Sequence, residues 1–399
     1  MPRPGPVLVL NAGSSSLKYA IIDPGSGDRT LTGLAERLGT TDAVMTLSVE
    51  GHDVESPELV HGTHHEAVSA VLEAARDLSE SLRPVGVGHR IVHGGGRFTE
   101  SVLVTESVEA AIRSLSALAP LHNPPALEGI DAVRALWPEL SQVAVFDSAF
   151  HHTMPARAYR YAVPHEWYTG LAVRRYGFHG TSVRYVSERA SSLLGRPPED
   201  LALVVAHLGN GCSATAVLGG RSVDTTMGLT PLEGLVMGSR SGDVDPGLFG
   251  YLARRASMSG EEVLEALNAR SGLLALSRIG NDMREIQAAA DGGDREAALA
   301  VDVFVYRLAK AVAALVVAMG RLDALVFTGG IGEHSGPVRA GVVDSLGFLG
   351  LRLDDAANAA DGRDTGGRID GGGTPAVLVV ATDEERMIAQ DTIRLVGDA

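Results

Sequence analysis

The chain has 399 residues, which is too long for one ordinary hydrophobic core and predicts two domains. Hydrophobic residues make up 45% of it and charged residues 21%, a balance typical of a folded globular protein and not of a disordered chain. The net charge of −15 argues against nucleic acid or an anionic membrane as a partner. Any anion site must therefore be built locally from arginine, lysine and backbone N–H groups.

The first predicted element is a β-hairpin over residues 7–23, VLVLNAGSSSLKYAIID. Its turn offers Asn11, Gly13 and Lys18 together with three serine hydroxyls, groups that can donate hydrogen bonds to phosphate oxygens. A serine-rich turn without a ligand explains the same pattern. The turn lacks the Gly-Lys-Ser/Thr ending of a Walker A motif. The apolar run at residues 7–10 is shorter than a signal-peptide core, so we expect no secretion signal here.

A capping box formed by Thr63 and Glu66 predicts the start of a helix whose apolar spacing continues to residue 82. Arg90 follows in the glycine-flanked segment GHRIVHGGG, and Asp147 comes directly after the apolar run VAVF. An arginine with apolar and glycine neighbours is a candidate for binding carboxylate or phosphate, although most arginines are solvated surface charges. A carboxylate at a strand end is either functional or the N-cap of a following helix.

His179 lies between glycines in RRYGFHGTS, a setting that indicates close packing against a ligand. A structural role is the alternative for a single histidine. Ser182 predicts the start of a helix that stops at Gly195. The other histidines lack metal-ligand spacing, and HExxH and CxxC motifs are absent from the sequence, so we expect no zinc site.

A second hairpin is predicted over residues 201–220, LALVVAHLGNGCSATAVLGG. Its turn, residues 207–211, can surround phosphate with backbone N–H groups. The only cysteine, Cys212, follows the turn, and without a partner at a recognisable spacing it is best explained as a small buried thiol. The two hairpins occur early in each half of the chain, which favours two similar domains, although strand–turn–strand patterns also recur by chance.

Further along, Arg240 lies in the glycine-flanked loop GSRSGDVDPG. The apolar stretch at residues 297–319 is interrupted by charged residues, so it predicts a buried core helix and not a membrane span. The glycine cluster TGGIGEHSG, residues 328–336, follows a short apolar strand, where α/β proteins bind nucleotides. Residues 354–373 predict a surface excursion, and Glu384 follows the apolar run VLVV.

The motifs together resemble the acetate kinase family. NAGSSSLK, RIVHGG, FDSAFH, YGFHGTS, HLGNG, GSRSGDVDP, FTGGIGE and TDEE occur in that family's order between Asn11 and Glu385. The resemblance implies an α/β fold of two similar actin-like (ribonuclease H-like) domains flanking an active-site cleft. We expect an N-terminal domain of residues 1–149 with 385–399, and a C-terminal domain of residues 150–384 that binds nucleotide and forms the dimer interface.

The resemblance also implies a role for individual residues. Asp147, His179, Arg240 and Arg90 would be catalytic, and Asn11 with Glu384 would hold Mg²⁺, with Mn²⁺ as the alternative ion. The acetate pocket would be formed by Arg90, Val92, Leu121, Phe178 and Pro231. The nucleotide would contact Lys18, His207, Leu208, Gly209, Asn210, Gly211, Asp282, Met283, Arg284, Gly330, Ile331, Gly332, Glu333 and His334.

The implied function is reversible, Mg-dependent phosphoryl transfer from ATP to acetate in a cytoplasmic homodimer, with no nucleic-acid or membrane partner. Propionate or butyrate kinase is the alternative enzyme, and an actin-like ATP-binding clamp is the alternative without catalysis. Three positions depart from the family pattern, His334 for asparagine, Ser239 for threonine and Val183 for histidine. The first of these affects the expected adenosine contacts.

Overall fold

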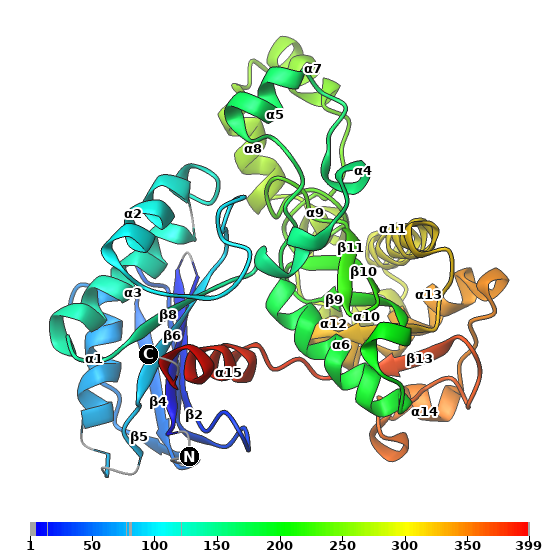
Figure 1. Cartoon of the computed structure of the whole chain (residues 1–399). Coiled ribbons are helices and arrows are strands. Elements are labelled where there is room, and N and C mark those ends of the chain that lie inside the picture. Colours follow the sequence, from blue (N-terminus) through cyan, green and yellow to red (C-terminus); the bar gives the residue numbers. More distant parts are fainter. Residues whose placement is uncertain (1–4, 14, 77, 80–81, 121, 398–399) are drawn as a thin grey trace. The chain divides into compact units, whose positions relative to one another are not determined.

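The computed structural model describes residues 5–13, 15–76, 78–79, 82–120 and 122–397 (Figure 1). It contains two β-sheets and many helices, which confirms the predicted α/β class. The chain divides into two compact units, unit 1 (Met1–Phe150 with Asp383–Ala399) and unit 2 (His151–Thr382). Unit 1 is therefore made from two separate stretches of the chain.

Unit 1 is built on an eight-stranded sheet in the order β5-β4-β3-β2-β1-β6-β8-β7. The strands are β1 (Val7–Ala12), β2 (Ser16–Ile22), β3 (Arg29–Glu36), β4 (Val44–Val49), β5 (His52–Val54), β6 (Gly86–Ile91), β7 (Val102–Leu103) and β8 (Gln142–Phe146). Strands β1, β6 and β8 are parallel to one another, so their carboxyl ends meet at one edge. The predicted first hairpin is confirmed, because β1 and β2 pair antiparallel from Val7 opposite Ile22 to Ala12 opposite Leu17.

Successive residues of a strand point to opposite faces of the sheet, and in the central strands the residues on both faces are apolar. Both faces of this sheet are therefore covered by helices. The helices of unit 1 are α1 (His64–Arg76), α2 (Glu106–Ser114), α3 (Asn123–Leu136) and α15 (Glu384–Gly397), with the short 3₁₀ helix η2 (Leu115–Ala117). Leu8 and Leu10 belong to a core shared with α1 and α3. Val7 and Val9 belong to a second core that contains Ile388 of α15.

Unit 2 contains a five-stranded sheet in the order β11-β10-β9-β12-β13. Its strands are β9 (Ala202–Leu208), β10 (Cys212–Leu218), β11 (Arg221–Thr225), β12 (Ala324–Thr328) and β13 (Ala376–Val379). Antiparallel pairing of β9 with β10 confirms the second hairpin. The order and directions of these strands repeat those of β3-β2-β1-β6-β8 in unit 1, so the two units share a topology.

The helices of unit 2 are α4 (Ala156–Tyr159), α5 (His165–Leu171), α6 (Gly180–Leu194), α7 (Gly247–Ala256), α8 (Gly260–Ala269), α9 (Gly272–Ser277), α10 (Met283–Asp291), α11 (Arg295–Met319), α12 (Gly329–His334), α13 (Gly336–Ser345) and α14 (Asp355–Ala359). Some of these helices lie beside the sheet of unit 2, whereas α5, α7 and α8 form a group farther from it (Figure 1). Short 3₁₀ helices occur at η3 (Ala149–Thr153), η4 (Pro198–Asp200), η5 (Gly347–Leu349) and η6 (Arg363–Thr365). Both α6 and α11 pack against β9.

The helix predictions hold with corrected boundaries. The Thr63 hydroxyl accepts from the Glu66 N–H at 3.1 Å, but the Glu66 carboxylate accepts from the Val60 and His61 N–H groups, so only half of the predicted capping box forms. Helix α1 ends at Arg76 and not at residue 82. Helix α6 starts at Gly180, two residues before the predicted Ser182, and stops as predicted at Gly195, whose φ of 61° is left-handed. The long helix α11 buries one face only, because Asp302 and other charged side chains remain exposed on the opposite face. Residues 354–373 are largely exposed, as predicted, but they contain helix α14 and the buried side chains of Ile369 and Asp370.

Candidate active site

Arg90 is the centre of a polar cluster at the carboxyl edge of the unit 1 sheet. It is the second-last residue of β6, and its guanidinium donates to both Asp147 oxygens, with Nε at 3.1 and 3.0 Å and Nη2 at 2.5 Å from Oδ2. Its Nη1 donates to Asn11 Oδ1 at 3.0 Å, and its Nε lies 3.9 Å from Glu384 Oε2. The four residues come from β1, β6, the end of β8 and the start of α15, so the predicted unit 1 residues are brought together.

The electrostatics of this cluster keep Arg90 charged. Burial opposes its charge, but the carboxylates of Asp147 and Glu384 outweigh burial and raise its pKa. Asp147 is 1% exposed, and a buried carboxylate of this kind is stable only when paired with a cation. The pair therefore presents a fixed guanidinium at the sheet edge, with its donors already oriented.

The segment that follows Arg90 is fixed by side chains from neighbouring elements. The Asn123 side chain accepts from the His93 N–H at 3.2 Å and donates to the His93 carbonyl at 3.1 Å. The Ser148 hydroxyl accepts from the Gly94 N–H at 2.9 Å. Val92, which directly precedes His93, is 5% exposed. This part of unit 1 is thus a rigid loop and not a flexible glycine tract.

In unit 2, His179 and Arg240 converge on the turn of the second hairpin. A side-chain carbon placed on Gly211 would lie 3.3 Å from His179 Nε2 and 3.6 Å from Arg240 Nη1. Arg240 Nη1 also donates to the Pro231 carbonyl at 2.9 Å. His179 itself is the N-cap of α6 with a left-handed φ of 57°, a conformation that is uncommon for a residue other than glycine. Glycine at position 211 keeps the space in front of both side chains open.

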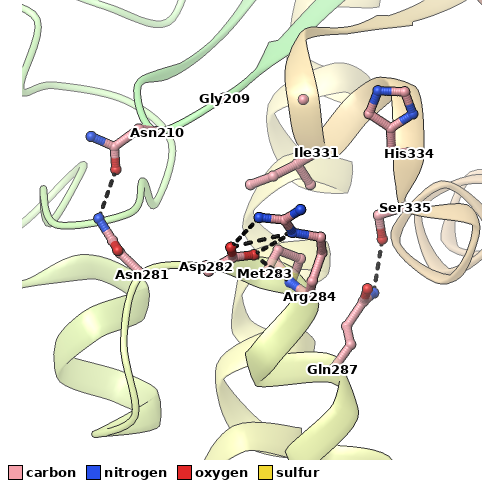
Figure 2. Close-up of a pocket in the computed structure, with 11 residues that line it drawn as sticks. Gly209, Asn210, Asn281, Asp282, Met283, Arg284, Gln287, Ile331, His334 and Ser335 are labelled. Atoms are coloured by element: carbon pink, nitrogen blue, oxygen red, sulfur yellow. Dashed lines mark hydrogen bonds and ion pairs between the residues drawn. The ribbon is translucent and has the colours of Figure 1, made fainter. Parts of the chain in front are cut away.

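A hollow of about 460 Å³ lies at the carboxyl ends of β9 and β12 in unit 2 (Figure 2). Its lining consists of Gly209, Asn210, Asn281, Asp282, Met283, Arg284, Gln287, Gly330, Ile331, His334 and Ser335. The hollow is large enough for a small-molecule ligand. Its position agrees with the rule that α/β proteins bind ligands beyond the carboxyl ends of their parallel strands.

Short polar contacts organise this hollow, as Figure 2 shows. Asp282 caps helix α10, and its carboxylate accepts from Arg284 Nη2 at 2.6 Å. The Arg284 side chain lowers the pKa of Asp282 to about 2, so the carboxylate stays ionised. Arg284 itself is 87% exposed, and its guanidinium remains accessible from the hollow. Gln287 bonds to Ser335 at 2.8 Å and links α10 to the segment after α12.

The remaining predicted nucleotide residues lie near the hollow without lining it, or in unit 1. His207, Leu208 and Gly211 belong to the same hairpin, and Gly332 and Glu333 belong to α12. The Glu333 carboxylate accepts from the Gly329 and Thr382 N–H groups at 2.9 and 3.2 Å. Lys18 lies in unit 1, where it pairs with Glu385 at 2.7 Å.

The predicted acetate pocket is distributed over both units. Val92 belongs to unit 1, whereas Phe178, 1% exposed, and Pro231 belong to unit 2. Leu121 lies outside the described residues. The common pocket of these side chains stays a prediction.

The residue-by-residue prediction missed three lining residues, Asn281, Gln287 and Ser335. Asn281 directly precedes Asp282, and Gln287 lies about one helical turn after the start of α10, so the helix that follows an N-cap aspartate was the available signal. Cys212 is fully buried and donates to the Gly209 carbonyl at 3.2 Å. Burial raises its pKa to about 12, which makes it a structural thiol, as predicted.

Two searches within the described residues bear on the predicted partners. They contain no group of three or more histidine, cysteine, aspartate or glutamate side chains placed to bind a metal ion. No helix in the described part of the chain has the length and apolar character to cross a membrane. A metal site made partly of amide and substrate oxygens is a different kind of site, and the unit 1 cluster offers such oxygens on Asn11 and Glu384.

A ligand-sized hollow over one actin-like sheet and a fixed arginine over the other are features of a phosphotransferase with an anionic acceptor. A family model described as the acetokinase family matches residues 6–390. Because this match covers nearly the whole chain, the chain belongs to the acetokinase family. Membership implies a kinase that acts on a carboxylate, with ATP as co-substrate and a divalent metal ion.

Individual relatives agree with this family. The chain is 55% identical to acetate kinase from Deinococcus radiodurans over 390 residues, 98% of each chain. It is 50% identical to acetate kinase from Chromobacterium violaceum over 391 residues, again 98% of each chain. Among solved structures it resembles a propionate kinase from Francisella tularensis, with a TM-score of 0.92, 43% identity and coverage of 98% of this chain and 100% of that one. Acetate kinase from Porphyromonas gingivalis gives a TM-score of 0.89 at 40% identity, covering 98% and 99%.

Proposed function

We propose that the protein catalyses reversible phosphoryl transfer from ATP to acetate, giving acetyl phosphate and ADP. The observation that carries the proposal is the fixed guanidinium of Arg90, held by Asp147 at 2.5 Å and supported by Asn11 at 3.0 Å. A guanidinium with oriented donors matches the two oxygens of a carboxylate. The ligand-sized hollow of unit 2 supports the second half of the proposal, a nucleotide as phosphoryl donor.

The reaction needs no general base. A carboxylic acid with a pKa of roughly 4–5 is already ionised at neutral pH, so acetate can attack the γ-phosphorus of ATP directly and in line. The main obstacle is repulsion between two anions. We assign Arg90 to the acetate carboxylate and assign Arg240 and His179 to the phosphoryl group in transit, where they neutralise charge or donate hydrogen bonds.

Asp147 acts in this proposal by orientation. Both of its oxygens accept from Arg90, which places the guanidinium and maintains its charge. A carboxylate occupied in this way is better suited to positioning Arg90 than to accepting a proton.

Asn11 and Glu384 would hold the divalent ion, which we propose to be Mg²⁺, with Mn²⁺ as the alternative. Both supply oxygen ligands of the kind that Mg²⁺ prefers, and few protein ligands suffice because this ion keeps several waters and binds phosphates. When bound, the ion would neutralise charge on the phosphate oxygens. Glu384 begins helix α15, whose N-terminus therefore carries the ligand to the sheet edge.

The nucleotide would enter the hollow of unit 2, with its phosphates toward the turn at residues 209–211 and its base among Arg284, Ile331 and His334. An exposed guanidinium can stack on a planar base. His334 stands where the resemblance predicts asparagine, so we expect the base contacts to be specific to this chain.

Propionate is the second candidate acceptor, favoured by the structural similarity to the Francisella tularensis propionate kinase. Two curated relatives at 50–55% identity are acetate kinases, and Val92 is expected to restrict the acyl pocket. One methylene changes the selectivity of a hydrophobic pocket by about 10–200-fold, so the acceptor with the highest kcat/KM identifies the substrate.

The test is to incubate the purified protein with ATP, Mg²⁺ and formate, acetate, propionate or butyrate, and to trap acyl phosphate with hydroxylamine. We expect acetyl phosphate as the main product, and little trapped product from the Arg90→Gln variant. The exposed Arg254→Gln variant is the control for loss of an arginine. Binding of ATP without any acyl phosphate from the four acids would contradict the proposal and favour the actin-like clamp.

We further propose a homodimer formed through helix α11. This helix exposes Leu299 by 49%, Tyr306 by 59% and Val317 by 82%, at spacings of 7 and 11 residues that place them on one face. A second copy of the chain would cover this face. Light scattering after size-exclusion chromatography should give twice the mass of the chain, and Tyr306→Glu with Val317→Glu should give a monomer.

The proposed location is the cytoplasm. The single cysteine, buried and protonated, is compatible with a reducing compartment. Fractionation of cells that make the protein tests this point.

A further inference from the structure

The ring of His179 rests on a cross-strand pair of the second hairpin. His207 on β9 and Ser213 on β10 are direct partners in the antiparallel register. The His179 ring stacks on the His207 ring with centroids 4.2 Å apart, and its Nδ1 lies 3.0 Å from Ser213 Oγ. The ring is thus restrained on one face by an aromatic neighbour and at one nitrogen by a hydroxyl.

The direction of the Ser213 hydrogen bond follows from counting donors and acceptors. Ser213 is fully buried, and in the described part of the chain its Oγ has one hydrogen-bond partner, His179 Nδ1. A buried hydroxyl hydrogen needs an acceptor. If Nδ1 carried a proton and donated to Oγ, the hydroxyl hydrogen would have no acceptor. The economical arrangement is therefore donation from the Ser213 hydroxyl to an unprotonated Nδ1.

This direction fixes the other ring nitrogen. A neutral imidazole carries one proton, so an unprotonated Nδ1 means that Nε2 bears the hydrogen. Nε2 lies on the Gly211 side of the ring, 3.3 Å from a carbon placed on that glycine, and Arg240 Nη1 lies 3.6 Å from the same carbon. In the opposite tautomer a lone pair would face the same space and would repel a phosphoryl oxygen.

We infer that Ser213 is a positioning residue that holds His179 as the Nε2–H tautomer, so that a neutral His179 donates to a transferring phosphoryl oxygen. The identity of that oxygen rests on the proposed function. The tautomer of His179 does not depend on the proposed function. A further set of hydrogen bonds fixes the neighbouring ring of His207. Ser182 Oγ lies 2.8 Å from His207 Nδ1 and 2.7 Å from Thr382 Oγ1. These bonds hold the ring on which His179 stacks.

A matched control exists elsewhere in unit 2. His151 is a buried histidine whose Nδ1 likewise lies 2.9 Å from a fully buried serine hydroxyl, that of Ser222. Ser222→Ala removes the same type of bond away from Gly211 and Arg240. If the two variants lose equal stability, a loss of activity found in Ser213→Ala alone comes from the position of His179 and not from weaker folding.

The direct test is histidine ring NMR on ¹⁵N-labelled full-length protein without ligands, with the His179 signals assigned from the His179→Gln variant. The wild-type protein and Ser222→Ala should show His179 protonated at Nε2 alone. Ser213→Ala should show a mixture of the two tautomers. An unchanged Nε2–H signal in Ser213→Ala, or a wild-type ring protonated at Nδ1, would overturn the inference.

Kinetics supply the functional readout. Loss of one such hydrogen bond should lower kcat of Ser213→Ala about tenfold with KM for ATP and acetate unchanged, while Ser222→Ala keeps the wild-type kcat. Should Ser213→Ala fail to fold, Ser213→Cys keeps a weaker donor of similar size and should lose less activity. Full turnover by His179→Ala would refute the proposed role of His179, whereas normal turnover by Ser213→Ala with an inactive His179→Ala would refute the positioning role alone.

Discussion

At the scale of single residues, the chain places its buried charges where partners come from distant parts of the sequence. Arg90 and Asp147 could be selected from sequence because glycines flank the first and a strand precedes the second. Their contact with each other, across 57 positions, could not be predicted from the sequence, because the parallel pairing of β6 with β8 is what makes them neighbours.

Arg339 shows more clearly which contacts the sequence does not predict. Its guanidinium is fully buried and donates to the Gly332 and Glu333 carbonyls, to Asn358 and to Asp361. It thereby ties the end of α12, which carries part of the nucleotide hollow, to α14. In the sequence it is one arginine of a helix among many, with no feature that distinguishes it from a solvated charge.

Asp147→Asn should reduce kcat by about 100-fold or more, because the amide retains the shape but removes the charge that holds Arg90. Steady-state kinetics with ATP and acetate measure the loss. The exposed Asp42→Asn in the same unit should keep normal turnover. Full activity of Asp147→Asn with an unchanged pH profile would contradict the orienting role.

Arg240→Ala should lower kcat by about 1,000-fold, because an arginine that stabilises a phosphoryl group in flight contributes at this level. Folding should change little, since the Arg240 side chain is only partly buried and is not part of the core. Circular dichroism and thermal unfolding check the fold, and Arg254→Ala is the surface control. Near-normal turnover would remove Arg240 from the mechanism.

Buried histidines predict how stability depends on pH. His89 is 1% exposed and lies 2.7 Å from Gln142 Oε1, and burial lowers its pKa to about 4 from an ordinary 6.5. Between these values the unfolded chain binds a proton that the folded chain excludes, so stability falls as the pH drops from 6.5 to 4, by about 3 kcal/mol for this residue.

Urea unfolding at several pH values measures this effect. His89→Gln should flatten the pH dependence in that window, whereas the exposed His52→Gln should leave it unchanged. An identical slope in His89→Gln and the wild-type protein would show that His89 does not exclude the proton.

At the scale of elements, local patterns predicted the two hairpins, the start of α1 and the end of α6, because turn glycines and caps act over a few residues. The registers, from Val7 opposite Ile22 and from Cys212 opposite Leu208, follow from these turns. Helix α15 is different. It was not predicted from the sequence, and its place against β6 and β1 depends on chain segments about 300 or more positions earlier.

The contact between α15 and β6 depends on the absence of a side chain on the strand. A carbon added at Gly88 would lie 2.5 Å from both Ile388 Cγ2 and Thr392 Oγ1. Gly88→Ala should therefore destabilise unit 1 by about 1–3 kcal/mol through overpacking. Gly96→Ala, which meets open space, is the matched control. Equal midpoints of chemical unfolding for the two variants would show that α15 can move away at little cost.

At the scale of the whole molecule, length alone predicted two domains, and the repeated hairpin predicted their likeness. The full repeat of five strands in the same order and directions required the structure, because strand pairing joins segments that lie far apart in the sequence. The repeat has been used differently in the two units, since one sheet edge carries an arginine–carboxylate cluster and the other a hollow.

This division predicts where each ligand stabilises the protein. ATP at 100 times its Kd should stabilise unit 2 by about 2.7 kcal/mol and slow the most protected amide exchange there about 100-fold, including α10 and α12. Acetate alone should act on the ends of β6 and β8 instead. Hydrogen-exchange mass spectrometry resolves the two patterns. Protection by ATP that is confined to unit 1 would contradict a nucleotide site in unit 2.

Unit 1 is interrupted by the whole of unit 2, and this has a consequence for biosynthesis. A ribosome completes the sheet of unit 1 early, but the helix that shields Val7 and Val9 is translated only after residue 382. Until then the nascent sheet keeps an uncovered apolar face, and exposed apolar surface of this kind makes a folding intermediate prone to aggregation. Unit 2, encoded without interruption, can mature first, so the half of the molecule that begins the polypeptide is the last to become native.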